Sequence, residues 1–284
     1  MTNSNPLVKP FIKWAGGKRQ LLPEIQKHIP KNINNYTYYE PFVGGGAVFF
    51  NLQPEKAVIN DINEQLIHAY NAIKDNVDDL VKLLRNYAKE NDKDFYYSIR
   101  RLDRDNNFDS LTGLEKAARL IYLNKTCYNG LYRVNSSGFF NVPYGKYESP
   151  AICETKTLHQ ISEYLNSNKI RVLCGDYEKA VHSADDKSFV YFDPPYHSPN
   201  RKNFTSYQDK EFNETDHERL RDIMIRLTDR GVKCLLSNSD TEFTRKLFEK
   251  DIFEVIPVQA KRKINSKSSG RGFVSEILVK NWKN

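Results

Sequence analysis

The chain has 284 residues, of which 39% are hydrophobic and 28% charged, and its formal net charge is +7. This composition is typical of a globular protein, and no apolar stretch approaches the roughly 20 residues that a membrane helix needs. Residues 1–9 are polar, so we expect neither a secretory signal nor membrane association. The four scattered cysteines and six scattered histidines show no metal-binding or disulfide pattern, which suits a reducing cytoplasm. The positive charge permits a nucleic-acid partner without establishing one.

Short apolar runs alternate with helical stretches, which predicts an α/β fold built on a sheet. In the first part we expect strands at 36–42 and 57–59. Apolar residues then recur at spacings of three and four from Ile62 to Leu84, which predicts one long amphipathic helix. Residues 91–147 contain one good helix and then a stretch rich in glycine and aromatic residues. We interpret this middle part as an insertion between two halves of one α/β domain.

The second half of the chain returns to the same alternation. The expected strands are 170–173, 189–192 and 232–236, followed by a closing antiparallel pair at 252–258 and 273–280. Before the strand at 232–236, Thr215 and Glu218 form a capping-box pattern that predicts a helix start, and Gly231 follows its expected end.

Several polar or glycine-rich motifs lie directly after predicted strands. In an open α/β sheet, ligands bind at this edge, where the strands end. Phe42 and the glycines Gly44 to Gly46 follow the first strand, so their backbone amides can approach a ligand closely. The next strand ends at Asp61, whose carboxylate can accept both hydroxyls of a ribose. Together they indicate a nucleoside-containing cofactor. The structural alternative is a tight glycine turn with Asp61 as a helix N-cap.

The sharpest motif is Asp193-Pro194-Pro195-Tyr196, at the end of a predicted strand. Its prolines stiffen the turn, so that the carboxylate and the backbone carbonyls can accept both protons of an exocyclic amine. Tyr196 can stack on the planar base that carries this amine. A simple Pro-Pro turn is the alternative, and the other motifs disfavour it.

Five motifs stand in a fixed order along the chain: PFIKWAGGKRQLL, YEPFVGGGAVFF, NDIN, GDY and YFDPPY. In this combination the sequence resembles the S-adenosylmethionine-dependent N6-adenine DNA methyltransferases of the Dam and DpnM type (class alpha). The resemblance runs from Phe11 to about Tyr207 and resumes at 235–238. It implies a Rossmann-like mixed seven-stranded sheet with an inserted, mostly helical target-recognition domain.

The resemblance also implies domain limits. The catalytic domain, which binds S-adenosylmethionine, would comprise 1–75 and 165–284. The inserted DNA-recognition domain would comprise 76–164, with a recognition hairpin near 127–147.

Single residues receive roles in the same way. The resemblance implies cofactor contacts by Trp14, Lys18, Phe42, Gly44, Gly46, Asp61, Asp176, Tyr177 and Asp193. Asp193, Pro194, Pro195 and Tyr196 would hold the flipped target adenine as the catalytic motif. Without the resemblance, Trp14 is better explained as a core anchor and Lys18 as a solvated helix residue.

The hairpin carries parts suited to reading a duplex. Its sequence is similar to the recognition hairpin of members specific for GATC, and five aromatic residues between Tyr128 and Tyr144 disfavour a plain surface loop. Arg133 would read a guanine with a two-pronged hydrogen bond. The other contacts implied are Tyr128 and Asn129 in the gap left by the flipped adenine, Leu131 and Pro143 on a thymine methyl, Lys13 at the outer guanine, and Tyr147.

Basic residues elsewhere predict contacts with the DNA backbone. They are Lys261, Arg262, Lys263 and Arg271, in a loop rich in serine and glycine. Arg100, Arg101 and Arg104 form a second cluster, for which a solvated helix face is an equal alternative. The segment 197–207 follows the catalytic motif and is placed to close over the flipped base.

We therefore expect an enzyme that transfers a methyl group from S-adenosylmethionine to adenine N6 in duplex 5′-GATC, with base flipping and without a metal. It would act in the cytoplasm of a bacterium, encoded by the bacterium or a phage, beside a restriction endonuclease or alone. The alternatives are the same chemistry on a different or longer site or on single strands, and a DNA-binding module without catalysis. The intact Asp193 motif disfavours the last. It also disfavours transfer to cytosine N4 or protein glutamine, whose related turns begin with Asn or Ser.

Overall fold

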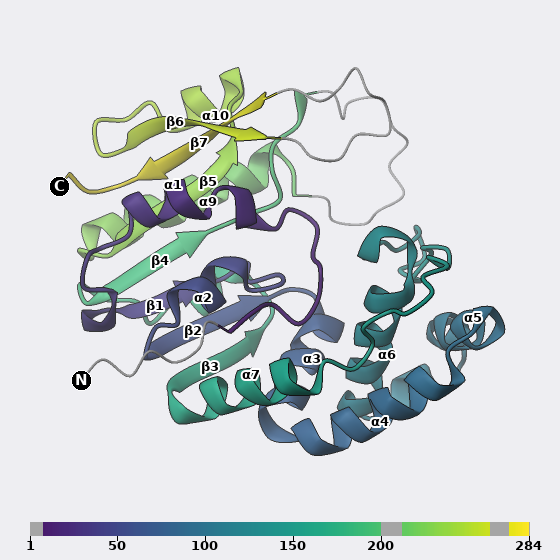
Figure 1. Ribbon diagram of the computed structural model, residues 1–284. Helices are drawn as coiled ribbons and strands as arrows, with labels where there is room; N and C mark the ends of the chain where they lie inside the picture. Colours follow the sequence, from purple (N-terminus) through teal and green to yellow (C-terminus); the bar gives the residue numbers. More distant parts are fainter. Residues whose placement is uncertain (1–7, 200–211, 262–272, 284) are drawn as a thin grey trace.

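The computed structural model describes residues 8–199, 212–261 and 273–283. A seven-stranded sheet lies at its centre, in the order β3-β2-β1-β4-β5-β7-β6 (Figure 1). The strands are β1 (Thr37–Glu40), β2 (Lys56–Asp61), β3 (Lys169–Cys174), β4 (Ser188–Phe192), β5 (Lys233–Ser239), β6 (Glu254–Lys261) and β7 (Phe273–Lys280). β7 runs antiparallel to both β5 and β6, whereas the other neighbours are parallel. The expected mixed seven-stranded sheet is confirmed.

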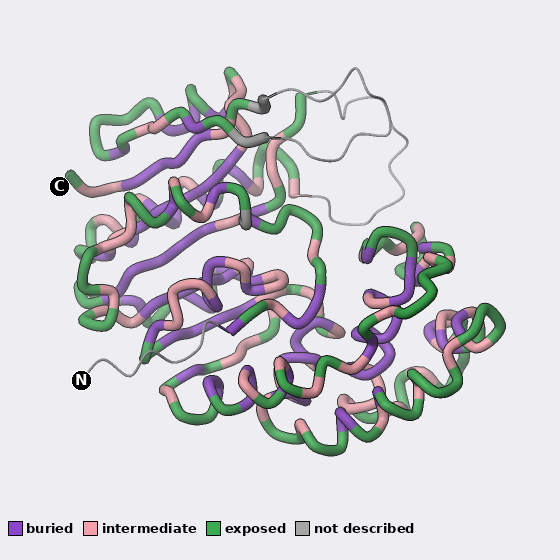
Figure 2. The backbone as a smooth tube through the Cα atoms, viewed as in Figure 1, coloured by how far each residue is buried: buried purple, intermediate pink, exposed green. Residues whose placement is uncertain are grey.

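Helices cover both faces of the sheet. They are α1 (Leu22–Lys27), α2 (Ala47–Leu52), α3 (Glu64–Asp75), α4 (Val77–Glu90), α5 (Lys93–Arg101), α6 (Gly113–Thr126), α7 (Thr155–Ser167), α8 (Tyr177–Ala180), α9 (Glu214–Asp229) and α10 (Glu242–Leu247). Alternate residues of one strand enter different cores. Tyr38 packs with α1, α2, α3 and α7, whereas Tyr39 packs with α8, α9 and α10. The central strands β1, β2, β4 and β5 are therefore largely buried on both sides, as their apolar runs require (Figure 2), whereas the edge strands β3 and β6 are partly exposed.

Between α3 and α7 the chain leaves the sheet and forms α4, α5, α6 and the hairpin 127–147, on the right of Figure 1. Arg119 of α6 is buried and pairs with Asp103 at 2.7 Å. Asp103 in turn accepts a hydrogen bond from the backbone N–H of Phe140, also at 2.7 Å. The buried ion pair of Arg119 and Asp103 thus holds the hairpin against α6 through the backbone of Phe140. Within the described ranges, no helix is long and apolar enough to cross a membrane.

Two sequence expectations about helix ends are wrong. The long helix expected from Ile62 to Leu84 is two helices, because Asn76 leaves the helical conformation with φ −141° and ψ 39°. The capping box before α9 is formed by Asn213 and Asp216 rather than by Thr215 and Glu218. Asn is an equally good N-cap, and the hydrogen bond from Asp216 N–H to the Asn213 side chain begins the helix at Glu214.

Candidate active site

The order of the strands places the site. β1 and β4 are neighbours at the centre of the sheet, where the strand order reverses and ligands bind beyond the carboxyl ends. The glycine turn after β1 and the Asp193 motif after β4 therefore lie side by side. The end of β2 delivers Asp61 to the same edge.

The glycine turn is shaped by side chains that leave no room for a Cβ atom. Gly44 has φ +50°, and a Cβ there would lie 2.8 Å from Cδ1 of Trp14. Gly46 has φ +71°, and its Cβ would lie 2.7 Å from the Tyr70 hydroxyl oxygen. Tyr70 donates that hydroxyl to the Gly44 carbonyl at 3.0 Å. These glycines are required both by their backbone conformation and by close packing.

Asp61 holds the turn from the neighbouring strand. Its Oδ2 accepts the backbone N–H of Gly44 at 3.0 Å, and its Oδ1 accepts that of Asn63 at 2.9 Å. Burial raises the pKa of Asp61, whereas these two backbone hydrogen bonds lower it. The N-cap of α3 is Asn63, which accepts from Leu66 N–H at 3.0 Å. Asp61 is therefore not the helix N-cap that the structural alternative required.

The surroundings of Asp61 fit a nucleoside. Ile62 directly follows Asp61 and is 75% exposed, so it presents an apolar side chain at this strand end. The rings of Phe42 and Tyr177 lie 4.9 Å apart at the adjoining strand ends. A carboxylate that can accept hydrogen bonds, a close-packed glycine turn and apolar surfaces together suit the binding of a ribose and a purine. The sequence reasoning missed Ile62, although it directly follows Asp61.

Asp176 precedes Tyr177 and is held by Arg219 of α9. Arg219 donates to both carboxylate oxygens of Asp176, at 2.8 and 2.9 Å. These hydrogen bonds hold the pKa of Asp176 below its usual value. The guanidinium also lies 4.8 Å from the centre of the Tyr177 ring. One arginine thus orients two expected cofactor residues.

Asp193 is surrounded by groups that favour its ionised form. Its Oδ1 lies 2.7 Å from the Lys18 ammonium and accepts the Ser237 hydroxyl at 3.0 Å. Burial raises the pKa of Asp193, and Lys18 and Ser237 oppose that rise. The ammonium also lies 4.4 Å from the centre of the Tyr196 ring, whose hydroxyl donates to Glu276 at 2.8 Å. Lys18, expected beside the cofactor, therefore contacts Asp193 and Tyr196 of the expected catalytic motif.

A second acid lies close to this cluster. Glu40, at the end of β1, is 2% exposed and accepts the Tyr38 hydroxyl at 2.6 Å. Burial raises the pKa of Glu40 to about 8, and the charge of Asp193 contributes to the rise. The sequence reasoning did not single out Glu40, although the strand-end position that marked Asp61 and Asp193 also applies to it.

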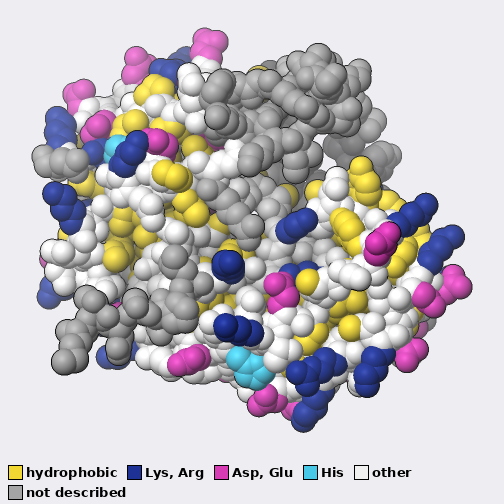
Figure 3. Space-filling view, in the orientation of Figure 1, with side chains coloured by type: hydrophobic (Ala, Val, Ile, Leu, Met, Phe, Trp, Pro, Cys, Tyr) yellow, Lys and Arg dark blue, Asp and Glu magenta, His cyan; other side chains and the backbone are white. Residues whose placement is uncertain are grey.

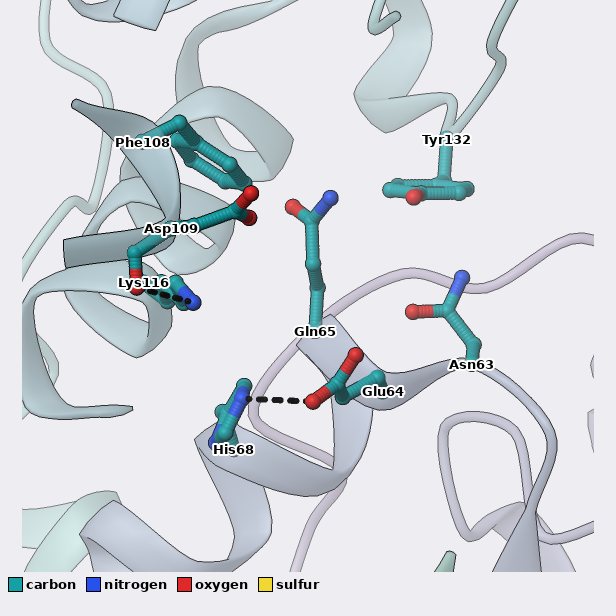
Figure 4. A pocket seen from close by; sticks show the side chains of 8 residues that line it. All are labelled: Asn63, Glu64, Gln65, His68, Phe108, Asp109, Lys116 and Tyr132. Atoms are coloured by element: carbon teal, nitrogen blue, oxygen red, sulfur yellow. Dashed lines mark hydrogen bonds and ion pairs between the residues drawn. The ribbon is translucent and has the colours of Figure 1, made fainter. Parts of the chain in front are cut away.

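The hairpin packs directly onto the amino-terminal segment. Tyr132 stacks on Trp14 with ring centroids 4.9 Å apart and an interplanar angle of 23°. Tyr132 also lies above Asn63 at the rim of a cavity of about 250 Å³ (Figure 4). Burial raises the pKa of Tyr132, and a hydrogen bond with Asn63 opposes part of that rise. The structure therefore brings the hairpin into contact with the residues around Asp61. Tyr132 was not among the expected site residues.

The expected DNA-contacting side chains of the hairpin face outward. Three of the five exposed large hydrophobic side chains in the described residues lie here, namely Tyr128 (55%), Leu131 (41%) and Tyr147 (39%). Lys13, Asn129, Arg133 and Pro143 are also exposed. Arg133 donates its Nε–H to Asn141 across the hairpin at 2.7 Å, which holds the guanidinium in place. A grouping of exposed apolar side chains marks an interaction surface.

The basic clusters divide into three cases. Arg100 donates to the Val142 carbonyl at 3.2 Å and Arg104 to the Phe140 carbonyl at 2.9 Å, so both support the hairpin from within the protein. Arg101 is exposed. β6 ends at Lys261, whereas Arg262, Lys263 and Arg271 lie outside the described residues, as does the segment 197–207 beyond residue 199.

Charge is mixed on one face of the molecule. On the face shown in Figure 3, Lys and Arg side chains are spread out with Asp and Glu between them. Among the described residues on this face, the basic side chains do not gather into one broad patch (Figure 3). In the part of the chain that the structure describes, no three His, Cys, Asp or Glu side chains gather as metal ligands.

Known proteins resemble this chain over nearly its whole length. A sequence model of the family "D12 class N6 adenine-specific DNA methyltransferase" matches residues 14–264. The Type II methyltransferase M1.LlaDCHI of Lactococcus lactis subsp. cremoris is 48% identical, over 98% of this chain and 96% of that protein. Type II methyltransferase M.MjaIII of Methanocaldococcus jannaschii is 43% identical, over 97% and 99%. The DNA adenine methylase of Escherichia coli K12 is 35% identical, over 95% and 94%.

Proposed function

The chain belongs to the D12 class of N6 adenine-specific DNA methyltransferases, and we propose that its substrate is the adenine of duplex 5′-GATC. Enzymes of this class use S-adenosylmethionine as the methyl donor. The observation that carries the proposed site is the exposed hairpin surface of Tyr128, Leu131 and Tyr147 next to the exposed Lys13. The sequence of this hairpin is similar to that of the recognition hairpin in GATC-specific members of the family.

The geometry of Asp193 supports a direct role in transfer. S-adenosylmethionine supplies an activated methyl group, so attack by adenine N6 needs alignment more than strong acid–base catalysis. Within the described residues, the contacts of Asp193 with Lys18 and Ser237 fall on Oδ1. We assign Oδ2 and the Pro194 carbonyl as acceptors of the two amine protons. This pairing draws the N6 lone pair out of conjugation with the ring.

The same carboxylate can take the proton that the reaction releases. When N6 forms its bond to the methyl carbon and the bond from that carbon to sulfur breaks, the nitrogen must lose one proton. Asp193 accepts it, since burial raises the pKa of this carboxyl. Tyr196 stacks on the adenine, with its hydroxyl fixed by Glu276.

The cofactor would lie along the strand ends already described. We propose that Asp61 binds the ribose of the cofactor and that the turn with Gly44 and Gly46 lies beneath its methionine part. Trp14 would lie at the border of the cofactor site. Phe42, Ile62, Asp176 and Tyr177 would surround the adenine of the cofactor. Lys18 would contact both the cofactor and Asp193, as its position against the Asp193 carboxylate favours.

The target adenine of a duplex must be flipped out, at a cost of a few kcal/mol. We assign this step and site recognition to residues 76–164, and chiefly to the hairpin. Tyr128 and Asn129 would fill the vacated space. Tyr147 supports Asn129, because its hydroxyl accepts the Asn129 backbone N–H at 3.0 Å.

The remaining DNA contacts define the sequence. Arg133 and Lys13 would each read a guanine, and Leu131 with Pro143 would pack on a thymine methyl. Lys261, Arg262, Lys263 and Arg271 would contact phosphates. The second candidate is the same chemistry on a different or longer site or on single strands. Since two relatives are named Type II methyltransferases, we also propose a role beside a restriction endonuclease in the cytoplasm.

The direct test is the transfer of labelled methyl groups from S-adenosylmethionine to synthetic DNA. The substrates are a GATC duplex, matched duplexes with one base pair altered, the single strands, and a GATC duplex methylated on both adenines. We expect incorporation only into unmethylated or half-methylated GATC duplexes. Equal incorporation into the altered duplexes would leave adenine methylation standing and overturn the proposed site.

A further inference from the structure

Asn124 lies near the end of α6, and its side chain joins two distant parts of the chain. It is 3% exposed. Its Oδ1 accepts the Lys13 backbone N–H at 3.0 Å, while its Nδ2 donates to the Lys13 carbonyl at 2.7 Å and to the Gly130 carbonyl at 3.1 Å. The amide therefore uses its oxygen and both of its protons. It holds the backbone of Lys13 at two points and the hairpin at a third.

The hairpin is shaped to receive the Lys13 side chain. Gly130 has φ +64°, and a Cβ there would lie 2.8 Å from Cδ of Lys13 and 3.3 Å from its Cβ. The aliphatic stem of Lys13 thus passes directly over the hairpin backbone. A larger residue at position 130 would displace it.

The helix that carries Asn124 is a rigid support. Every residue from Ala117 to Asn124 is buried. In the same helix Arg119 is tied to the Ile99 carbonyl at 3.0 Å and to the Arg100 carbonyl at 2.9 Å. Asn124 therefore ties the backbones of Lys13 and Gly130 to the rigid helix α6.

We propose that Asn124 is a positioning residue for DNA sequence discrimination. It fixes Lys13 against the hairpin. Lys13 and Arg133 are thereby held in a fixed position relative to each other and contact the same DNA site. Hydrogen bonds to base edges weaken steeply with distance and angle, so a small displacement of the Lys13 backbone is enough to lose one. The inference rests on the proposed function, in which Lys13 and Arg133 contact guanines.

The test uses GATC duplexes already methylated on one strand, so that one adenine remains and each altered base pair has a defined place relative to it. Asn124→Asp keeps the size and the acceptor of the side chain, but it removes the protons given to Lys13 and Gly130. We expect it to lower discrimination, measured as the ratio of kcat/KM values, by about tenfold at one outer base pair. That base pair is the one at which Lys13→Ala also loses discrimination.

The control and the double variant separate positioning from general damage. Thr126 is buried in the same helix and donates to the Tyr122 carbonyl at 2.7 Å, so Thr126→Val removes a hydrogen bond without touching Lys13. It should keep full discrimination. In the Lys13→Ala background, Asn124→Asp should cause no further loss.

Three results would overturn the inference: full discrimination by Asn124→Asp, equal losses at all base pairs, or additive losses in the double variant. If Asn124→Asp does not fold, Gly130→Ala serves instead, because its Cβ would meet Lys13 Cδ at 2.8 Å from the other side while the Asn124 side chain is kept. It should show the same loss at the same base pair. A wild-type enzyme that does not discriminate among the duplexes would overturn the proposed site itself, and the inference with it.

Discussion

Lys18 and Asp193 form an ion pair of 2.7 Å between the amino-terminal segment and the end of β4, with both side chains largely shielded from water. The pair compensates a buried carboxylate that would otherwise be costly to ionise. It also joins the amino-terminal segment that carries Lys18 to the Asp193-Pro194-Pro195-Tyr196 motif. The chemistry at Asp193 should therefore depend on Lys18.

Asp193→Ala should abolish methyl transfer, since the acceptor for the substrate amine is lost. Cofactor binding should remain measurable by calorimetry, because Asp61 and the glycine turn are untouched. Ser237→Ala is the graded comparison. It removes one hydrogen bond to Asp193 worth about 1 kcal/mol and should slow turnover about fivefold. Unchanged turnover in Asp193→Ala would contradict the catalytic assignment.

Lys18→Met should shift the pH profile of single turnover at saturating cofactor. Asp193 must be ionised to accept the amine, so activity falls as the pH falls through its pKa. Without the ammonium, burial raises that pKa further, and the acid limb moves to higher pH. Lys27→Met, which breaks an exposed pair with Glu24, should leave the profile in place. Superimposable profiles for Lys18→Met and wild type would refute this dependence.

Glu40 should make the protein less stable as the pH rises. Its pKa is about 8 in the folded chain against an ordinary 4.5, so between these values the unfolded chain loses the proton first and unfolding is favoured. Glu40→Gln removes this effect. Between pH 5 and pH 8 the unfolding free energy of the variant should fall less than that of the wild type, and the two changes should differ by at least about 1 kcal/mol. Urea titrations at both pH values measure it. Glu24→Gln, on the surface of α1, is the matched comparison, and a wild-type slope in Glu40→Gln would refute the raised pKa of the buried Glu40.

Arg133→Ala should relax discrimination at one guanine by about 1–3 kcal/mol. The Nε hydrogen bond to Asn141 leaves the terminal nitrogens of Arg133 to meet the base. Competition binding with single-base variants of the site measures the loss. Arg101→Ala, at an exposed arginine of α5, should preserve discrimination. If Arg133→Ala weakened binding to every duplex equally, Arg133 would be a phosphate contact.

Gly44→Ala should weaken cofactor binding about tenfold or more, because its Cβ would meet the Trp14 ring at 2.8 Å in a conformation that disfavours side chains. Gly231→Ala carries the same kind of backbone strain, with φ +76°, away from the site. The backbone strain alone should cost each variant about 1 kcal/mol of stability, and the contact with Trp14 adds to the loss in Gly44→Ala. Only Gly44→Ala should raise the dissociation constant of the cofactor. Equal constants in both would show that the turn does not contact the cofactor.

Local patterns predicted most of the elements. The strand ends at Asp61 and Phe192 were placed correctly, because buried strands produce apolar runs that polar residues terminate. The helix break at Asn76 was not foreseen, since the apolar spacing continues through it. Periodicity reports which residues are buried, but it does not report whether the backbone between them stays helical.

The sequence by itself determined the order of the motifs, the strand ends that carry them and the family to which the chain belongs. Only the tertiary structure decided which side chains meet: Lys18 with Asp193, Trp14 with Tyr132, and Asn124 with Lys13. The reason is physical. A motif is set by neighbours along the chain, whereas these contacts depend on how the sheet, α6 and the hairpin pack, and each joins residues that no local pattern relates.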